Sequence, residues 1–275
     1  MEDIITLGFD NISSNQINQN YTPSVIQANT LFNFVSERKW LFDAIEKKYL
    51  NPFYCEEDIS YLHIPTKKIA IPMKCFCDIR LSRLDYHMNF YGGYGIGFNK
   101  EWGLERGIQP VQYINPDSEF AKLISETANM LIRNEVETDE ISENLKSMFT
   151  FELFYLKPYS GELKNRKTSE VSMKCFEDEN EWRYIPNMEK LGMPQTFSEG
   201  NFVNQKQIDE YNETIAKTDS VSIKFEYSEI KYIVLENETD FFDFSNYLKS
   251  CGIKETDRDI LKSKVLIWNK AKEDF

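Results

Sequence analysis

The chain has 275 residues, with 32 Lys and Arg against 45 Asp and Glu, and a formal net charge of −13 at pH 7. A chain of this length buries a sizeable core without disulfides or metals, and its 41% hydrophobic residues are typical of a packed domain. The acidic balance excludes non-specific nucleic-acid binding, because phosphate backbones repel it, and it favours a basic protein partner.

No segment resembles an export signal or a membrane anchor. The N-terminus, Met1-Glu2-Asp3, is acidic, and no apolar run approaches the ~18 residues of a spanning helix. The five cysteines are odd in number and lack framework spacing, which indicates reduced thiols and a cytoplasmic protein. Cys75-Phe76-Cys77 has no second Cys or His pair, so we expect strand cysteines and no metal site.

The first half of the chain predicts an arm, a helix and several strands. Residues 1–30 are expected to form an N-terminal arm, because 11–30 is rich in Asn, Gln, Ser and Thr. Ser36 is expected to cap a helix. A strand over 69–76 carries Pro72 and is therefore expected near a sheet edge. Further strands are expected at 94–98 and 111–114.

The middle of the chain predicts two helices and a loop. Ser118 is expected to cap a helix, and a second helix begins near Asp139. Residues 158–168 read as an exposed loop because of Pro158, Gly161 and several basic residues. The first helix is expected to bury one apolar face, made by Phe120, Leu123, Ile124, Thr127 and Leu131.

Strands return toward the C-terminus. Alternation from Val221 to Tyr227 predicts a strand, and the apolar run 232–235 predicts a central one. Thr239 or Asp240 is expected to cap a helix that ends at Gly252, and 265–268 is a last expected strand. The order predicts an α+β fold over 31–275, a single domain with a mixed or antiparallel sheet and flanking helices.

One segment combines polar groups, aromatics and glycines. The glycine-rich segment from Tyr91 to Gly97 leads into a strand, so it is either a tight turn or a loop bordering a ligand, with Tyr91 and Tyr94 as stacking surfaces. His87 precedes it and is either a site residue or an ordinary structural histidine.

The densest acidic segment is Glu177-Asp178-Glu179-Asn180-Glu181. In an extended segment Glu179 and Glu181 share a face, where one carboxylate can hold a sugar hydroxyl while the other steadies positive charge. Arg183 shares that face, so the alternative interpretation is a structural ion pair between Glu181 and Arg183.

These blocks, in this order, resemble the AbiGi-type abortive-infection proteins of bacterial phage defence over roughly residues 30–190. The resemblance rests on Leu31-Phe32-Asn33-Phe34, on Met73 to Ile79, on Tyr91 to Phe98 and on Glu179 to Tyr184. It implies an antitoxin or regulator that binds a partner protein, a nucleotidyltransferase-like toxin encoded by the second gene of the system.

The opening block also resembles, more distantly, the start of DNA-targeting ADP-ribosyltransferase toxins, with Asn33 where a His is usual. This likeness implies an alternative function as an NAD-dependent effector and an ADP-ribosyltransferase-like fold. The implied catalytic residues are Glu181, Glu179 and Asn33. The implied NAD-binding residues are Phe32, His87, Tyr91, Tyr94 and Gly95. We therefore expect Asn33, His87, the Tyr91–Gly97 segment and Glu181 to line one cleft.

Overall fold

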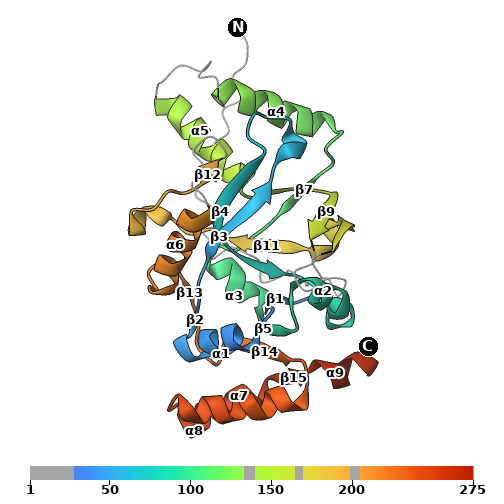
Figure 1. Cartoon of the computed structure of the whole chain (residues 1–275), viewed down its shortest axis with the longest axis vertical. Helices are drawn as coiled ribbons and strands as arrows, with labels where there is room; N and C mark the ends of the chain where they lie inside the picture. The colour runs from blue at the N-terminus through green and yellow to red at the C-terminus, as the bar shows by residue number, and fades with distance from the viewer. Residues whose placement is uncertain (1–27, 133–139, 165–169, 199–204, 275) are drawn as a thin grey trace, which may run out of the picture.

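The computed structural model describes residues 28–132, 140–164, 170–198 and 205–274 (Figure 1). The helices are α1 Arg38–Lys47, α2 Leu84–Tyr91, α3 Lys100–Glu105, α4 Glu119–Ile132, α5 Glu140–Leu153, α6 Gln205–Ala216, α7 Glu238–Ser250, α8 Glu255–Ser263 and α9 Trp268–Ala271. The strands are β1 Thr30–Val35, β2 Tyr49–Leu50, β3 Phe53–Asp58, β4 Lys68–Cys77, β5 Tyr94–Asn99, β6 Gln109–Pro110, β7 Gln112–Ile114, β8 Leu156–Pro158, β9 Ser160–Lys164, β10 Val171–Cys175, β11 Glu181–Tyr184, β12 Phe197–Ser198, β13 Ile223–Lys224, β14 Ile230–Leu235 and β15 Val265–Ile267.

The main sheet runs in the order β15-β14-β5-β1-β4-β11-β6, and β3 and β12 also pair with β4. Its pairs are antiparallel except for β14 with β15, which is parallel. The α+β class with a mixed sheet is therefore confirmed. Residues 1–27 of the expected arm lie outside the described residues, β1 begins at Thr30, and the single-domain organisation stays a prediction.

Strand β4 lies inside the sheet, so the edge position expected from Pro72 was wrong. The first half of β4 pairs with β3 and β12, and its second half pairs with β11. Tyr54 of β3 faces Pro72 but directs its own N–H and C=O to the side chain of Asn212. On the other side neither β11 nor β12 pairs at Pro72, so no partner requires the missing N–H.

Two apolar clusters cover the two faces of the strands β1, β5 and β14. On one face, side chains of α1, α3, α7 and α8 pack on Leu31, Ile96 and Phe98. On the other, α2 and α9 pack on Phe32 and Phe34. The period-2 alternation of strand side chains produces this division, because residues 31 and 32 point to opposite faces.

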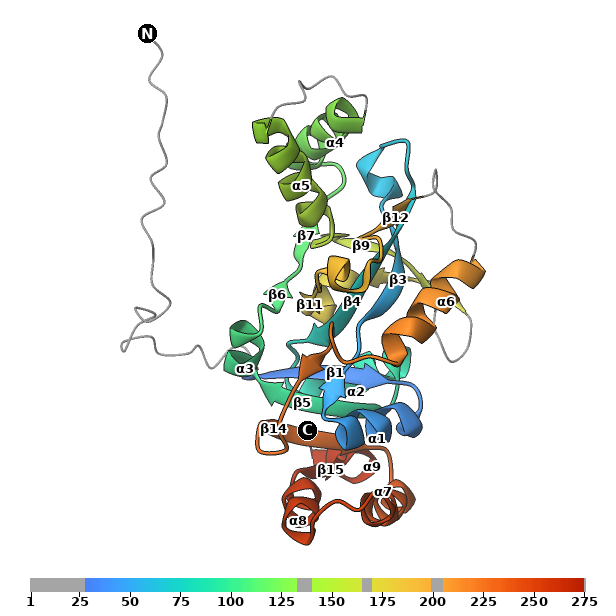
Figure 2. The ribbon, with the colours of Figure 1, turned by 90° about the vertical axis from the view of Figure 1, so that its left-hand side faces the viewer.

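A third cluster covers the first half of β4, where α4 and α5 pack on Ile69, Ile71 and Met73. A fourth joins α6 to β3 through Ile208, Ile215 and Tyr54. Figures 1 and 2 agree in placing α4 and α5 side by side at one end of the long axis, with α7 and α8 at the other.

The helix starts agree with the sequence in part. Ser118 caps α4, since its Oγ accepts a hydrogen bond from the Ala121 N–H at 3.1 Å. Helix α1 starts after Glu37 with no side-chain cap, so the Ser36 cap was wrong. Helix α7 is capped by Asn237, whose side chain accepts from the Asp240 N–H in a capping box, so neither Thr239 nor Asp240 is the N-cap.

The buried face of α4 differs from the expected one. Ala121, Ile124 and Ala128 are buried, whereas Phe120 and Leu123 are exposed. The apolar face of α4 is wider than the part of it that is buried against the core. The small alanines allow close approach to the core, and the larger side chains remain outside.

Two further expectations are corrected. Residues 158–168 are not simply a loop, because β8 and β9 occupy most of their described part, and 165–169 lie outside the described residues. The strand expected from Val221 to Tyr227 shortens to Ile223–Lys224, although all four alternating apolar side chains are buried. The strands expected at 94–98, 111–114, 232–235 and 265–268 are present as β5, β7, β14 and β15.

Candidate functional site

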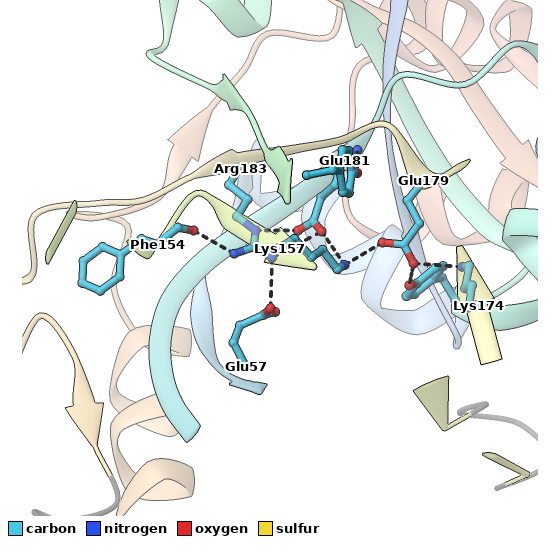
Figure 3. A network of polar contacts seen from close by, with 9 residues as sticks. Glu57, Phe154, Lys157, Lys174, Glu179, Glu181 and Arg183 are labelled. Carbon is cyan, nitrogen blue, oxygen red and sulfur yellow. Dashed lines mark hydrogen bonds and ion pairs between the residues drawn. The ribbon is translucent and has the colours of Figure 1, made fainter. Parts of the chain in front are cut away.

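Three carboxylates and three cations form a group inside the protein, beside β11 (Figure 3). We call it the buried ion cluster. Its formal charges cancel, which is what a low-dielectric interior requires of ionised groups. It lies on one face of the sheet, between the apolar cluster of α4 and α5 and that of α2. Its members are Glu57, Lys157, Lys174, Glu179, Glu181 and Arg183.

The chain brings Glu179 and Glu181 together by a turn. Phe176–Glu179 is a short 3₁₀ helix, Asn180 follows in the left-handed conformation at φ 42°, and Glu181 begins β11. Asn tolerates this backbone region better than most residues. The expected proximity of the two carboxylates is therefore present, although the segment is not fully extended.

Lys157 bridges the two carboxylates. Its Nζ lies 2.6 Å from Glu179 Oε2 and 2.7 Å from Glu181 Oε2. Arg183 approaches Glu181 from the other side, with Nε donating to Oε1 at 2.7 Å and Nη2 donating to Oε2 at 3.3 Å. The positive charges of Lys157 and Arg183 thus offset the electrostatic repulsion between the two neighbouring carboxylates.

Arg183 is fully buried and links the cluster to more distant segments. Its Nη2 lies 3.1 Å from Glu57 Oε2 of β3, and its Nη1 donates to the carbonyl oxygen of Phe154 at 2.7 Å. The guanidinium therefore ties β11 to β3 and to the end of α5. The ion pair with Glu181, which the sequence left as an alternative, is confirmed.

The charges of neighbouring side chains determine which groups of the cluster are ionised. Burial by itself raises the pKa of Glu181, but Arg183 and Lys157 outweigh it and hold that pKa below its ordinary value. The pKa of Glu179 is also lowered, since Lys157 outweighs the opposing effect of burial. The pKa values of Lys157 and Arg183 are raised, because the carboxylates outweigh burial. These four groups are charged at neutral pH.

Lys174 occupies the far end of the cluster, among aromatic rings. Its Nζ lies 2.9 Å from Glu179 Oε1 and 4.5–5.5 Å from the ring centres of Tyr86, Phe90 and Tyr91. Burial lowers the pKa of Lys174, and Glu179 offsets this only in part. Tyr91 also donates its hydroxyl to Glu179 Oε1.

The predicted site residues divide between the two faces of the sheet. Phe32 is in register with Cys77, and Cys77 with Glu181, so Phe32 and Glu181 share a face. Asn33, one residue on, points to the opposite face. The expectation that one cleft holds Asn33 and Glu181 is therefore corrected, because the sheet itself lies between their side chains.

His87 and Tyr91 lie on the Glu181 side. The ring centre of His87 is 4.5 Å from that of Tyr91 and 5.5 Å from that of Phe34. His87 is buried, and this desolvation lowers its pKa to about 4. It is neutral at pH 7 and packs as an aromatic ring. Phe32 stacks on Phe34 and on Tyr232, at 5.7 and 5.9 Å between ring centres.

The remaining predicted residues make structural contacts. Asn33 Nδ2 donates to the Cys75 carbonyl at 2.8 Å, and the Tyr94 hydroxyl lies 3.4 Å from both Asp240 carboxylate oxygens. Gly95 leaves room for the Phe34 ring, since a Cβ there would lie 2.5 Å from Phe34 Cε1. The individual roles predicted for these residues stay predictions.

Two shallow depressions lie on the described part of the surface. One, of about 520 Å³, lies around Arg106, Tyr184 and Lys224. The other, of about 310 Å³, lies around Phe32, Arg80 and Tyr232. Of the predicted site residues, Phe32 alone lines either depression, so neither depression opens onto the carboxylates of the buried ion cluster.

Comparison with known proteins decides the family. A family model described as "Putative abortive phage resistance protein AbiGi, antitoxin" matches residues 48–236. This chain belongs to the AbiGi family. It is 31% identical over 246 residues to the abortive phage resistance protein AbiGi of Lactococcus lactis subsp. cremoris, an alignment that covers 82% of this chain and 98% of that protein. No solved structure matches.

The AbiGi match places the chain in phage defence and includes the whole buried ion cluster. The resemblance seen in the sequence spans roughly residues 30–190, whereas the family model matches residues 48–236. The match therefore starts after β1 and α1 and continues to the end of β14. Asn33 and Phe32 lie outside it. The likeness to ADP-ribosyltransferases has no support in these comparisons and stays a prediction.

Sequence reasoning missed half of the cluster in this AbiGi-family chain. Lys157 adjoins a segment that was read as an exposed loop, Lys174 carried no motif, and Glu57 was not singled out. The Tyr113 hydroxyl, which accepts the Glu181 N–H at 2.8 Å, was also missed. No local pattern marks these residues, because each meets the cluster through pairing between distant segments.

The described residues have other features that bear on function. The five cysteines are free, and burial raises the pKa of the Cys75 and Cys77 thiols, so these two are protonated and unreactive at neutral pH. Within the described ranges no three His, Cys, Asp or Glu side chains gather as metal ligands. No described helix is long and apolar enough to cross a membrane.

Proposed function

We propose that this AbiGi-family chain is the antitoxin of a two-gene abortive-infection system and acts by binding its partner toxin. The observation that carries the proposal is that the acids of the buried ion cluster are paired with cations of the same chain. Both carboxylates to which the sequence assigns chemistry are held by cations of the same chain. A carboxylate whose charge is already compensated by cations of its own chain is poorly suited to stabilise a cation that forms during a reaction.

Two further features support an antitoxin. The family description names one. The net charge of −13 suits an inhibitor that attracts a basic partner surface, because opposite potentials raise the rate of encounter and select the partner.

Co-expression tests the proposal. The probe is the product of the gene adjacent to the gene for this chain, which the family resemblance leads us to expect is a nucleotidyltransferase-like toxin. We expect the two proteins to co-purify at low salt, and this chain to relieve the growth arrest that the probe causes. An unrelated toxin, whose arrest this chain should leave unchanged, is the control. Absence of both association and relief would overturn the proposal.

The NAD-dependent transferase remains the alternative from the sequence. It requires release of nicotinamide from labelled NAD, or transfer of label to a supplied protein or nucleic acid. A Glu181→Gln variant that still folds should then lose this activity. Such activity in the wild-type chain alone would favour the alternative over the antitoxin.

A further inference from the structure

Helices α4 and α5 lie side by side at one end of the molecule (Figures 1 and 2). Several of their large apolar side chains are exposed. Leu123 and Met148 are 59% and 61% exposed. Isolated exposed apolar residues are ordinary, but clustered ones mark places where another molecule binds. We define the apolar helix-pair surface as Phe120, Leu123 and Met130 of α4 with Leu145, Met148 and Phe151 of α5.

The pattern on α4 explains how this surface arises. Phe120, Leu123 and Met130 follow one another at helical spacing, beside the buried row of Ala121 and Ala128. The described core contacts the small side chains of the apolar side, and no described residue covers the large ones. An amphipathic helix normally buries its large residues, so the arrangement is typical of a helix with a second apolar contact.

Helix α5 has the same character. Its Phe149 is buried, whereas Leu145, Met148 and Phe151 are exposed at spacings of three residues. The two figures agree that α5 lies beside α4, so the exposed groups of both helices belong to one end of the molecule. This end is far from α7 and α8.

Charge decides which occupant fits. Helices α4 and α5 together contain five Glu and two Lys. Two copies of so acidic a segment repel each other, and so does an anionic lipid surface or a nucleic acid. A protein with an apolar patch bordered by Lys and Arg is attracted and can cover the exposed side chains.

We infer that the apolar helix-pair surface is the docking site for a basic face of the partner toxin. This inference rests on the proposed function and names the surface through which it acts. The partner contributes an apolar patch that packs on Leu123 and Met148, and its basic rim meets the acidic residues of the helix pair.

The test is binding of the same probe, the product of the adjacent gene, to the full chain and to a Leu123→Gln/Met148→Gln variant. Both side chains are exposed, so the variant should fold and melt as the wild type does. We expect its affinity for the probe to fall about 10- to 100-fold, since apolar anchors at the centre of an interface carry most of its binding energy.

The matched control is Phe242→Gln/Ile260→Gln, on α7 and α8 at the other end of the molecule. These side chains are 64% and 40% exposed, so the control removes a comparable apolar surface. We expect it to bind the probe as the wild type does. Equal binding by the Leu123→Gln/Met148→Gln variant and the wild type would overturn the inference while leaving the antitoxin proposal intact. A wild-type chain that neither binds nor neutralises the probe overturns both.

Discussion

The buried ion cluster and the apolar helix-pair surface depart from the usual distribution of residues in opposite directions. In the first, six charged groups lie inside the protein or at its margin, and in the second, six large apolar side chains lie outside it. The charges find their partners within the chain, since three acids meet three bases. The apolar groups of α4 and α5 have no such cover in the described residues. We therefore interpret the first departure as structural, and we propose that the second marks a contact with another molecule.

The largest effect should follow from removal of the guanidinium at the centre of the cluster. We expect Arg183→Met to reduce the free energy of unfolding by about 3–5 kcal/mol, because it leaves Glu181 buried with one cation fewer. The measurement is denaturant unfolding at pH 7. The matched control is Lys47→Met, which removes an exposed i,i+4 pair with Asp43 and should cost less than about 0.5 kcal/mol.

A double variant sharpens this prediction. Glu181→Gln/Arg183→Met removes both partners of the ion pair. We expect the loss of unfolding free energy in this double variant to be about 1–3 kcal/mol smaller than the sum of the losses in the two single variants. Strict additivity would show that the two side chains do not act as a pair, and would weaken the structural interpretation of the cluster.

Acid should destabilise the protein before its carboxylates are protonated. His87 has a folded pKa of about 4, below the ordinary 6.5, so the unfolded chain binds more protons between these two values. The contribution of neutral His87 is complete above pH 6.5 and is lost as the pH falls toward 4, by up to about 3 kcal/mol. Below pH 4.5, protonation of Glu179 and Glu181, whose folded pKa values are lowered, adds to the loss.

Urea unfolding between pH 7 and 4 measures this dependence. We expect His87→Phe, which keeps an aromatic ring between Phe34 and Tyr91, to flatten the curve between pH 6.5 and 4. His63→Asn, at an exposed histidine, is the control and should leave the slope as it is. A His87→Phe variant with the wild-type slope would contradict the assignment to His87.

The smallest effect on stability is expected at the apolar helix-pair surface. Leu123→Gln/Met148→Gln should change the free energy of unfolding by no more than about 0.5 kcal/mol, because both side chains are already in water. Thermal unfolding of the isolated chain measures it. A loss near that of Arg183→Met would place these side chains in the fold rather than on a docking surface.

Much of the secondary structure could be predicted from local pattern. The apolar run 232–235 identifies a strand, and Ser118 identifies the start of α4. Predictions were less reliable where one sequence pattern is compatible with two buried faces. The apolar side of α4 was found, but the part of it that the core covers was not, because Ala121 and Ala128 are short and the core selects them for close approach.

The candidate site divides in the same way. Glu181 and Arg183 lie two residues apart on a strand, so the sequence predicts that they share a face, and their ion pair follows. Lys157 and Glu57 come from other strands, and only the pairing of β3, β4 and β11 brings Glu57 near Arg183. Long-range pairing also places the sheet between Asn33 and Glu181.

The fold class, the family resemblance and the acidic character of this protein could be inferred from its residues alone, because period, motif and charge are local or additive properties. Which acids are compensated, and which apolar residues stay exposed, became known from the three-dimensional fold. Both depend on which distant segments become neighbours, and the energy of a charge or an apolar side chain is set by its final surroundings. The carboxylates of Glu179 and Glu181 thus belong to the interior, and the side chains of Leu123 and Met148 to the surface.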